Sequence, residues 1–294
     1  MNKKITATAF AILAAALYAI NIPFSKILME YVDSTMMAGL LYLGAGIGMF
    51  LYTSISGMTG EKIVKEPLTK AELPYIIAMI VLDIAAPILL MHGLRITTSA
   101  NATLLNNFEI VATSLIALIV FKEAVSKKLW GAIALVTLAS VILTLEGAGS
   151  FSFNIGSFMV LGAATCWGFE NNCTRMLSHK SSEQIVMIKG IFSGLGALIT
   201  ACFIEEQIPE LIYIIAVMVL GFVSYGLSIN FYIMAQAQLG AAKTSAYYSV
   251  APFLGVAFSL LMLGERPGVQ FYVALSVLIV GTILIVKDTL EENR

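Results

Sequence analysis

Charged residues are scarce in this sequence. Asp, Glu, Lys and Arg together make up 12% of the 294 residues, whereas hydrophobic residues make up 59%. An ordinary soluble domain carries about 25% charged residues, because the surface that meets water has to be largely polar. The shortage excludes a soluble globule with water on all sides. It indicates that lipid covers most of the exterior.

The chain also lacks long basic runs and cysteine clusters, and it has two histidines. The net charge is −1 and the longest basic runs are Lys3-Lys4 and Lys127-Lys128, so no nucleic-acid partner is expected. The three cysteines lie in apolar runs without ligand spacing to His92 or His179, which excludes a disulfide framework and a metal site. No nucleotide loop, Asp-rich motif or serine-protease motif is present. We therefore predict that the protein has no catalytic residues and no cofactor.

Ten apolar segments are each long enough to cross about 30 Å of hydrocarbon as a helix. They show no period-two alternation and are rich in Leu, Ala, Ile and Met, which favours helices over strands. The first segment could be taken for a secretory signal, but its apolar run continues too far for one. The expected spans lie near residues 6–28, 35–56, 74–94, 98–120, 129–147, 155–177, 184–204, 209–235, 242–263 and 269–287.

Basic residues are distributed unevenly between the two ends of these spans. Twelve Lys and Arg residues fall on the side of the N-terminus, and two, Arg95 and Arg266, fall on the other side. Loops that stay in the cytoplasm carry the excess of Lys and Arg. The count predicts a multi-pass protein of the cell membrane, inner or plasma, with both termini in the cytoplasm.

The two halves of the sequence resemble one another. The segment 14–21 can be aligned with 163–170, and 112–123 with 254–265. Because each half has five spans, an odd number, the second copy enters the membrane from the opposite face. The predicted fold is an all-α membrane protein of ten transmembrane helices, built as two inverted five-helix repeats, 1–148 and 149–294, within one transmembrane domain. Such repeats place a binding site near the bilayer midplane.

Several motifs recur at equivalent places in the two halves. They are Tyr18-Ala19 and Trp167-Gly168, the turns 93–100 and 237–242, Glu109-Ile110 and Ala251-Pro252, and Lys122-Glu123 and Gly264-Glu265. Over residues 6–287 the chain resembles EamA-type members of the drug/metabolite transporter superfamily. The resemblance implies a central cavity lined mainly by the first, third, fourth, sixth, eighth and ninth spans.

Two positions depart from the family pattern. Ile110 replaces the usual proline, so the kink in the fourth span is expected to be weaker or absent. Glu170 stands where the family more often has a neutral polar residue, as Asn21 does in the first half.

Three acidic residues lie well inside the predicted spans, away from their ends: Asp83, Glu109 and Glu170. A carboxylate at the centre of a span costs about 2.5–3.5 kcal/mol on insertion scales, so it usually faces a cavity or a partner. Each is a candidate for coupling transport to protons. Two simpler interpretations stay open, namely that Glu109 is a neutral, hydrogen-bonded acid and that Asp83 lies at a hydrated kink before Pro87.

The candidate solute-binding residues combine polar and aromatic side chains on the spans that the resemblance assigns to the cavity. An aromatic ring at these places can stack on a solute or pack between helices, whereas Gly44, Gly46 and Gly48 in the second span are expected to allow close helix contact. The full candidate set is Glu109, Asn106, Glu170, Asn21, Trp167, Tyr247, Tyr248 and Asn230.

The predicted function is secondary transport, as an exporter, of a small organic metabolite such as an amino acid or an amine. The inverted repeat and the helix-breaking Pro23, Pro87 and Pro252 favour alternating access over a static pore. The alternative is a facilitative channel or an exchanger without proton coupling. The expected partners are the solute, the lipid bilayer and the coupling proton, and the chain is a monomer or a homodimer.

Overall fold

The computed structural model describes residues 3–58, 68–120, 127–146, 152–177, 180–239, 247–248 and 250–291. In the first half these residues form α1 (Lys3–Ala19), α2 (Asn21–Leu28), α3 (Ser34–Met58), η1 (Lys70–Glu72), α4 (Leu73–Ile96), α5 (Ser99–Asn106), α6 (Phe108–Ile119), α7 (Lys127–Thr144) and β1 (Leu145–Glu146). In the second half they form β2 (Ser152–Phe153), α8 (Ile155–Met176), α9 (Ser182–Ile188), η2 (Lys189–Ser193), α10 (Gly194–Phe203), α11 (Leu211–Gly221), η3 (Phe222–Leu227), α12 (Ser228–Leu239), α14 (Ala251–Leu263) and α15 (Val269–Glu291).

Helices occupy every span that the sequence predicts, and the ninth span is described only at 247–248 and from 250 onwards. Within the described ranges, six helical stretches are long and apolar enough to cross a membrane, and α7, α14 and α15 contribute shorter apolar helices. α8 is in neither group, although it fills the predicted span 155–177. It carries the polar run Glu170-Asn171-Asn172 near its end, and this run contributes to the candidate site.

A short β-hairpin joins the two halves, and the all-α prediction did not include it. β1 pairs with β2 in antiparallel register, with Leu145 opposite Phe153 and Glu146 opposite Ser152. A two-stranded pairing needs few residues and leaves no periodic signal over so short a stretch. The predicted boundary between the halves, at 148/149, falls outside the described residues.

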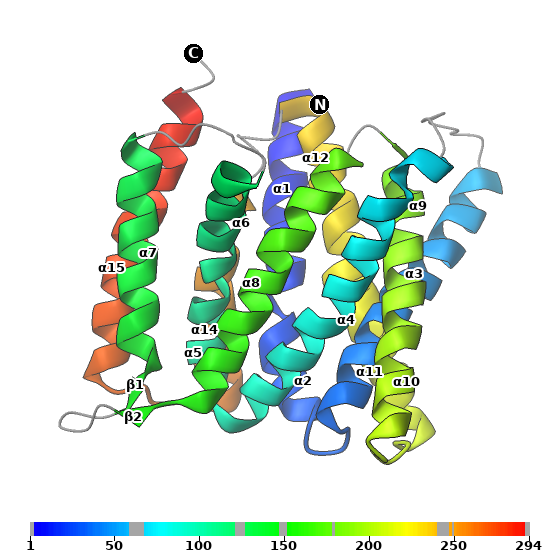
Figure 1. Ribbon diagram of the computed structural model, residues 1–294, viewed down its shortest axis with the longest axis horizontal. Coiled ribbons are helices and arrows are strands. Elements are labelled where there is room, and N and C mark those ends of the chain that lie inside the picture. Colours follow the sequence, from blue (N-terminus) through cyan, green and yellow to red (C-terminus); the bar gives the residue numbers. More distant parts are fainter. Residues whose placement is uncertain are drawn as a thin grey trace.

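The helices pass back and forth between the two ends of the bundle (Figure 1). α1 begins and α15 ends at the upper end in this view, whereas α8 begins at the lower end. The most extensive packing joins helices of different halves: α4 with α8, α7 with α15, α1 with α12, and α3 with both α10 and α11. The core therefore lies between the halves and not within each of them.

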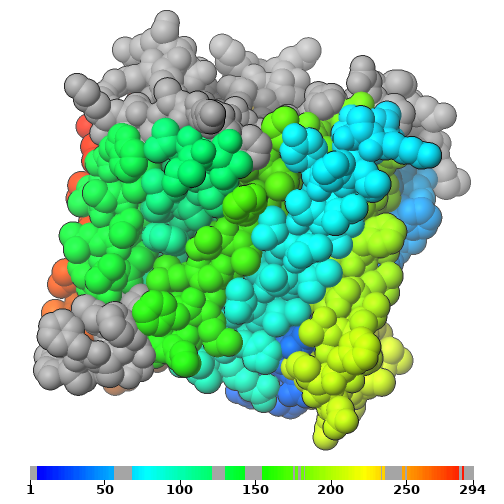
Figure 2. Space-filling view, in the orientation of Figure 1, coloured from blue at the N-terminus to red at the C-terminus, as the bar shows by residue number. Residues whose placement is uncertain are grey.

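α4 and α8 lie side by side across one broad face of the molecule (Figure 2). Helices α4, α7, α8 and α10 each carry large apolar side chains that are exposed, among them Val81, Leu138, Phe158 and Ile199. Many exposed side chains of this kind suit contact with lipid tails.

Glycines in α3 allow its backbone to approach the second half closely, as predicted. A Cβ built on Gly44 would lie 2.2 Å from the carbonyl oxygen of Met218, and one on Gly46 would lie 2.5 Å from the backbone nitrogen of Ile191. The opposing segments η2 and η3 are π-helical. A π-helical turn inside a longer helix is an uncommon feature that often marks a functional site.

The fourth span is interrupted at Asn107, although Ile110 replaces the expected proline. α5 ends at Asn106 and α6 begins at Phe108, and the Ile110 N–H donates to the Asn107 carbonyl three residues back at 3.1 Å. Asparagine side chains compete with the backbone for hydrogen bonds and weaken a helix interior. The interruption, which was expected to be weak or absent, thus forms at the asparagine pair without a proline.

Polar contacts close the lower end of the bundle between the two halves. Glu206 accepts hydrogen bonds from the backbone N–H groups of Thr35 and Met36 at the start of α3, at 3.0 and 2.6 Å. Glu265 accepts from those of Ser99 and Ala100 at the start of α5, at 2.8 and 2.9 Å. A carboxylate at a helix N-terminus satisfies free donors and complements the helix dipole.

Candidate functional site

Two buried carboxylates share one lysine at the junction of the halves. The Lys189 Nζ, at the start of η2, lies 3.2 Å from Asp83 Oδ2 on α4 and 3.0 Å from Glu170 Oε1 on α8. The side chains of Asp83 and Glu170 are 0% and 2% exposed, and that of Lys189 is 13% exposed. A charge buried to this degree has to be paired, so the three side chains depend on one another.

Hydrogen bonds extend this triad to α3. The Tyr42 hydroxyl donates to Asp83 Oδ1 at 2.8 Å, and Trp167 Nε1 donates to the Tyr42 hydroxyl at 3.1 Å. Asp83 is fully buried and α4 continues through Pro87 as one helix. The Asp83 carboxylate therefore contacts a lysine and a tyrosine, and the alternative of a hydrated kink before Pro87 stays a prediction.

The interruption at Asn107 separates two candidate residues on adjacent helices. Glu109, in the first turn of α6, accepts a hydrogen bond from Asn171 Nδ2 of α8 at 2.5 Å. Asn106, the last residue of α5, donates through Nδ2 to the Tyr18 hydroxyl at 2.8 Å. Its buried Oδ1 has no hydrogen-bond partner in the part of the chain that the structure describes. Glu109 lies within electrostatic range of Glu170 and Lys189.

A chain of tyrosine rings connects these groups. Tyr225 of η3 lies 5.1 Å from Tyr42 and 6.1 Å from Tyr18 between ring centroids, and Tyr18 lies 5.9 Å from Tyr248. The buried Asn21 donates through Nδ2 to the Tyr225 hydroxyl at 3.0 Å. The rings come from both halves and form one continuous aromatic surface.

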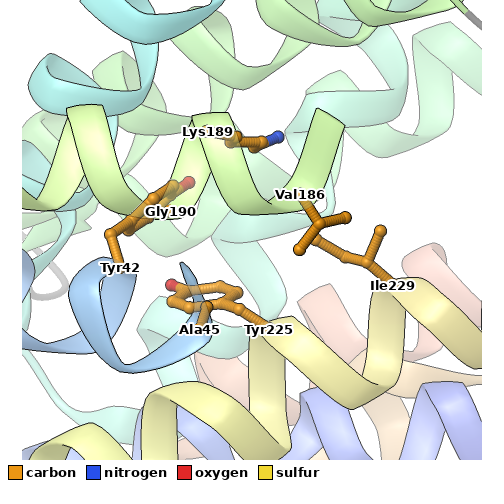
Figure 3. A pocket seen from close by; sticks show the side chains of 7 residues that line it. All are labelled: Tyr42, Ala45, Val186, Lys189, Gly190, Tyr225 and Ile229. Carbon is orange, nitrogen blue, oxygen red and sulfur yellow. The ribbon is translucent and has the colours of Figure 1, made fainter. Parts of the chain in front are cut away.

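A small pocket opens beside this surface. Its lining includes Tyr42, Tyr225 and Lys189, which come from α3, η3 and η2 (Figure 3). The cavity volume is about 10 Å³, enough for about one water molecule. This pocket therefore has no room for an organic solute.

The structure brings most of the predicted site residues together. Glu109, Asn106, Asp83, Glu170, Asn21, Trp167 and Tyr248 belong to the contacts above. Two residues do not join them. Tyr247 is 40% exposed, since consecutive helical residues point about 100° apart and its neighbour Tyr248 is the one that contacts Tyr18. The Asn230 amide lies 3.8 Å from Met234 Sδ, one turn along its own helix.

The sequence interpretation missed Lys189, Tyr42 and Tyr225 as site residues. Lys189 had a usable signal, because a lysine inside an apolar span requires a carboxylate partner. Tyr42 and Tyr225 had none, since tyrosines are common in membrane helices. Among the residues that the structure describes, no group of three His, Cys, Asp or Glu side chains is placed to hold a metal ion.

Long apolar helices that pack around a buried polar centre define a multi-pass membrane protein. The sequence matches the model of the EamA-like transporter family twice, over residues 5–145 and 154–287. The chain belongs to this family of transporters, which is not a family of enzymes.

The chain is also similar to one curated relative and to one solved structure. The chain is 25% identical over 293 residues to an uncharacterized transporter of Methanothermobacter thermautotrophicus (strain Delta H), and the match covers 93% of this chain and 84% of the relative. A solved crystal structure superimposes with a TM-score of 0.68 at 16% identity, over 95% of this chain and 94% of that one. At that identity the likeness concerns the fold alone.

Proposed function

We propose that the protein is a secondary transporter, an exporter by direction, of a small organic metabolite such as an amino acid or an amine. The observation that carries the proposal is the buried triad of Asp83, Lys189 and Glu170, held between helices of the two halves. Ionisable side chains at membrane depth are costly and mark solute and ion pathways. Packing of apolar helices against one another does not require three ionisable side chains.

Alternating access between two inverted five-helix repeats, 1–148 and 149–294, is the proposed mechanism. The opposite starting ends of α1 and α8 support it (Figure 1). The packing supports it as well. In each half the first span (α1 or α8) packs against the third span of the other half, so that the contact of α8 with α4 is the counterpart of the contact of α1 with α12. Rocking of one repeat against the other would expose a central site to each side in turn.

In this proposal the solute binds near Glu109 and Asn106, beside Tyr18 and Tyr248. Glu170, Asn21 and Trp167 form the surroundings of the site, and Glu109, Glu170 and Asp83 are the candidates for proton coupling. Burial in a low dielectric disfavours an ionised carboxylate, which favours proton uptake and release during the cycle. The contacts of Glu206 and Glu265 support a conformation that is closed at the lower end.

The transport test starts from a screen. Purified protein is heated with amino acids, polyamines, nucleobases and sugar phosphates, because a bound solute raises the melting midpoint by mass action. In proteoliposomes, a solute found in this way should then move when a pH gradient is imposed, and a protonophore should abolish the movement. Flux that ignores the gradient would instead support a facilitative channel or an exchanger without proton coupling.

Topology gives a separate prediction. Cysteines introduced at positions 205–208, between α10 and α11, should react with a membrane-impermeant reagent added to intact cells, because the basic-residue count places this loop outside. Position 70, the first residue of η1, should react only after permeabilisation. The reverse labelling pattern would reject cytoplasmic termini.

A further inference from the structure

The buried charges at the centre of the molecule are unbalanced. Asp83, Glu170 and Glu109 bring three carboxylates together, and among the described residues Lys189 is the cation that contacts this group. Lys189 is already engaged by Asp83 and Glu170. If all three carboxylates are ionised, the centre carries an excess of negative charge, which a low-dielectric environment penalises strongly. A positive group from outside the chain would restore the balance.

Glu109 is the carboxylate best placed to receive such a group. Its hydrogen-bond partner is the neutral amide of Asn171, at 2.5 Å, and not a cation. Its side chain is deeply surrounded by protein yet keeps accessible surface. A ligand that binds Glu109 would therefore displace no ion pair of this side chain among the described residues.

The neighbours of Glu109 suit a positively charged donor. Asn106 Oδ1 is a buried hydrogen-bond acceptor without a partner among the described residues, on a residue that is 7% exposed. The amide nitrogen of the same residue is held by the Tyr18 hydroxyl, which fixes the orientation of the oxygen. The Tyr18 ring lies between those of Tyr225 and Tyr248, and tyrosine faces attract cations.

We infer that Glu109, Asn106 and the ring of Tyr18 form a subsite for the ammonium group of an organic amine. The inference rests on the proposed transport function and names its solute class. Glu109 supplies the counter-charge, Asn106 Oδ1 accepts one N–H, and the aromatic surface covers the carbon skeleton. An organic anion does not fit here, because it would add negative charge beside Glu109 and Glu170.

The experiment compares ligands that share a carbon skeleton and differ in charge. The probes are butylamine with butanol and butyrate, phenethylamine with 2-phenylethanol and phenylacetate, and spermidine. Each is titrated against purified protein in detergent, with the melting midpoint and calorimetric binding as readouts. The amines should stabilise the protein, and the alcohols and carboxylates should not, because they lack the ammonium group that pairs with Glu109.

Variants assign the effect to the subsite. Glu109→Gln should weaken amine binding roughly ten- to a hundred-fold, the range expected for one charge-assisted hydrogen bond. Tyr18→Leu should weaken it more than Tyr18→Phe, which keeps the ring. Glu30→Gln removes an exposed carboxylate beyond the end of α2 and should leave binding unchanged.

Three results would overturn the inference: no binding of any amine, equal stabilisation by phenylacetate, or full amine affinity in Glu109→Gln. These results are distinct from failure of the transport proposal. Proteoliposomes that carry phenylacetate or another anion would retain the transporter and reject the amine subsite, whereas liposomes that carry none of the solutes found by the screen would reject transport itself.

Discussion

Replacing Lys189 with methionine is expected to lower the free energy of unfolding by about 3–5 kcal/mol, the usual cost of breaking a buried ion pair from one side. The lysine holds Asp83 and Glu170 at 3.2 and 3.0 Å, and both carboxylates would stay buried without a cation. Tyr42 can donate to Asp83, but one neutral hydrogen bond does not offset a buried charge. The loss of stability would be measured as a lower melting midpoint in thermal unfolding of the purified protein. Size-exclusion chromatography would then show how much of the variant stays unaggregated.

Two further variants isolate the cause. Lys189→Met combined with Asp83→Asn and Glu170→Gln removes all three charges, and most of the stability should return, since neutral groups in place of a buried ion pair are often tolerated. Lys287→Met, at an exposed position in α15, should melt like the parent. A Lys189→Met protein that also melts like the parent would contradict the pairing between the halves.

Gly44→Ala is expected to destabilise the protein by about 3 kcal/mol or more, above the usual range for overpacking. The added Cβ would lie 2.2 Å from the Met218 carbonyl oxygen and 2.5 Å from its Cα. Both are backbone atoms of α11, so neither can rotate away as a side chain would. Relief requires α3 and α11 to separate, which would show as a lower melting midpoint and a larger population of aggregated protein.

Gly131 in α7 is the matched control. A Cβ at this position would meet Leu284 Cδ1 at 3.7 Å, an ordinary van der Waals contact. Alanine is the better helix former by about 1 kcal/mol, so Gly131→Ala should be neutral or slightly stabilising. Equal stability of the Gly44→Ala and Gly131→Ala proteins would mean that α3 and α11 are not in close contact.

The helices were predictable because each leaves a long apolar run, and the lipid requires backbone hydrogen bonds to close within the segment. Local departures from regular helix could not be predicted from the sequence. The break at Asn107 and the π-helical turns η2 and η3 arise where the chain meets other helices. A short stretch of sequence contains no information about those neighbouring helices, because they lie far away along the chain.

The acidic residues of the candidate site could be predicted from the sequence, but the residues that they contact could not. Asp83, Glu109 and Glu170 stand out because a carboxylate within an apolar span is costly wherever it points. The partner of Asp83, in contrast, is 106 residues further along the chain, and the contact exists only once η2 packs between α3 and α4. The 40% exposure of Tyr247 was not predictable for a related reason, since the face that a helical residue presents depends on the rotation of its helix.

During synthesis, α3 and α4 enter the membrane before α8, η2 and α11 have been translated. At about 5–20 residues per second, the wait between α4 and the end of α10 lasts on the order of 5–20 seconds. Throughout that interval Asp83 lacks Lys189, and the glycines of α3 face no partner helix. The face of α3 and α4 that later packs against the second half must therefore be shielded during this time by lipid or by the insertion machinery. A chain that ended at the hairpin would expose this face permanently to the cell's quality control.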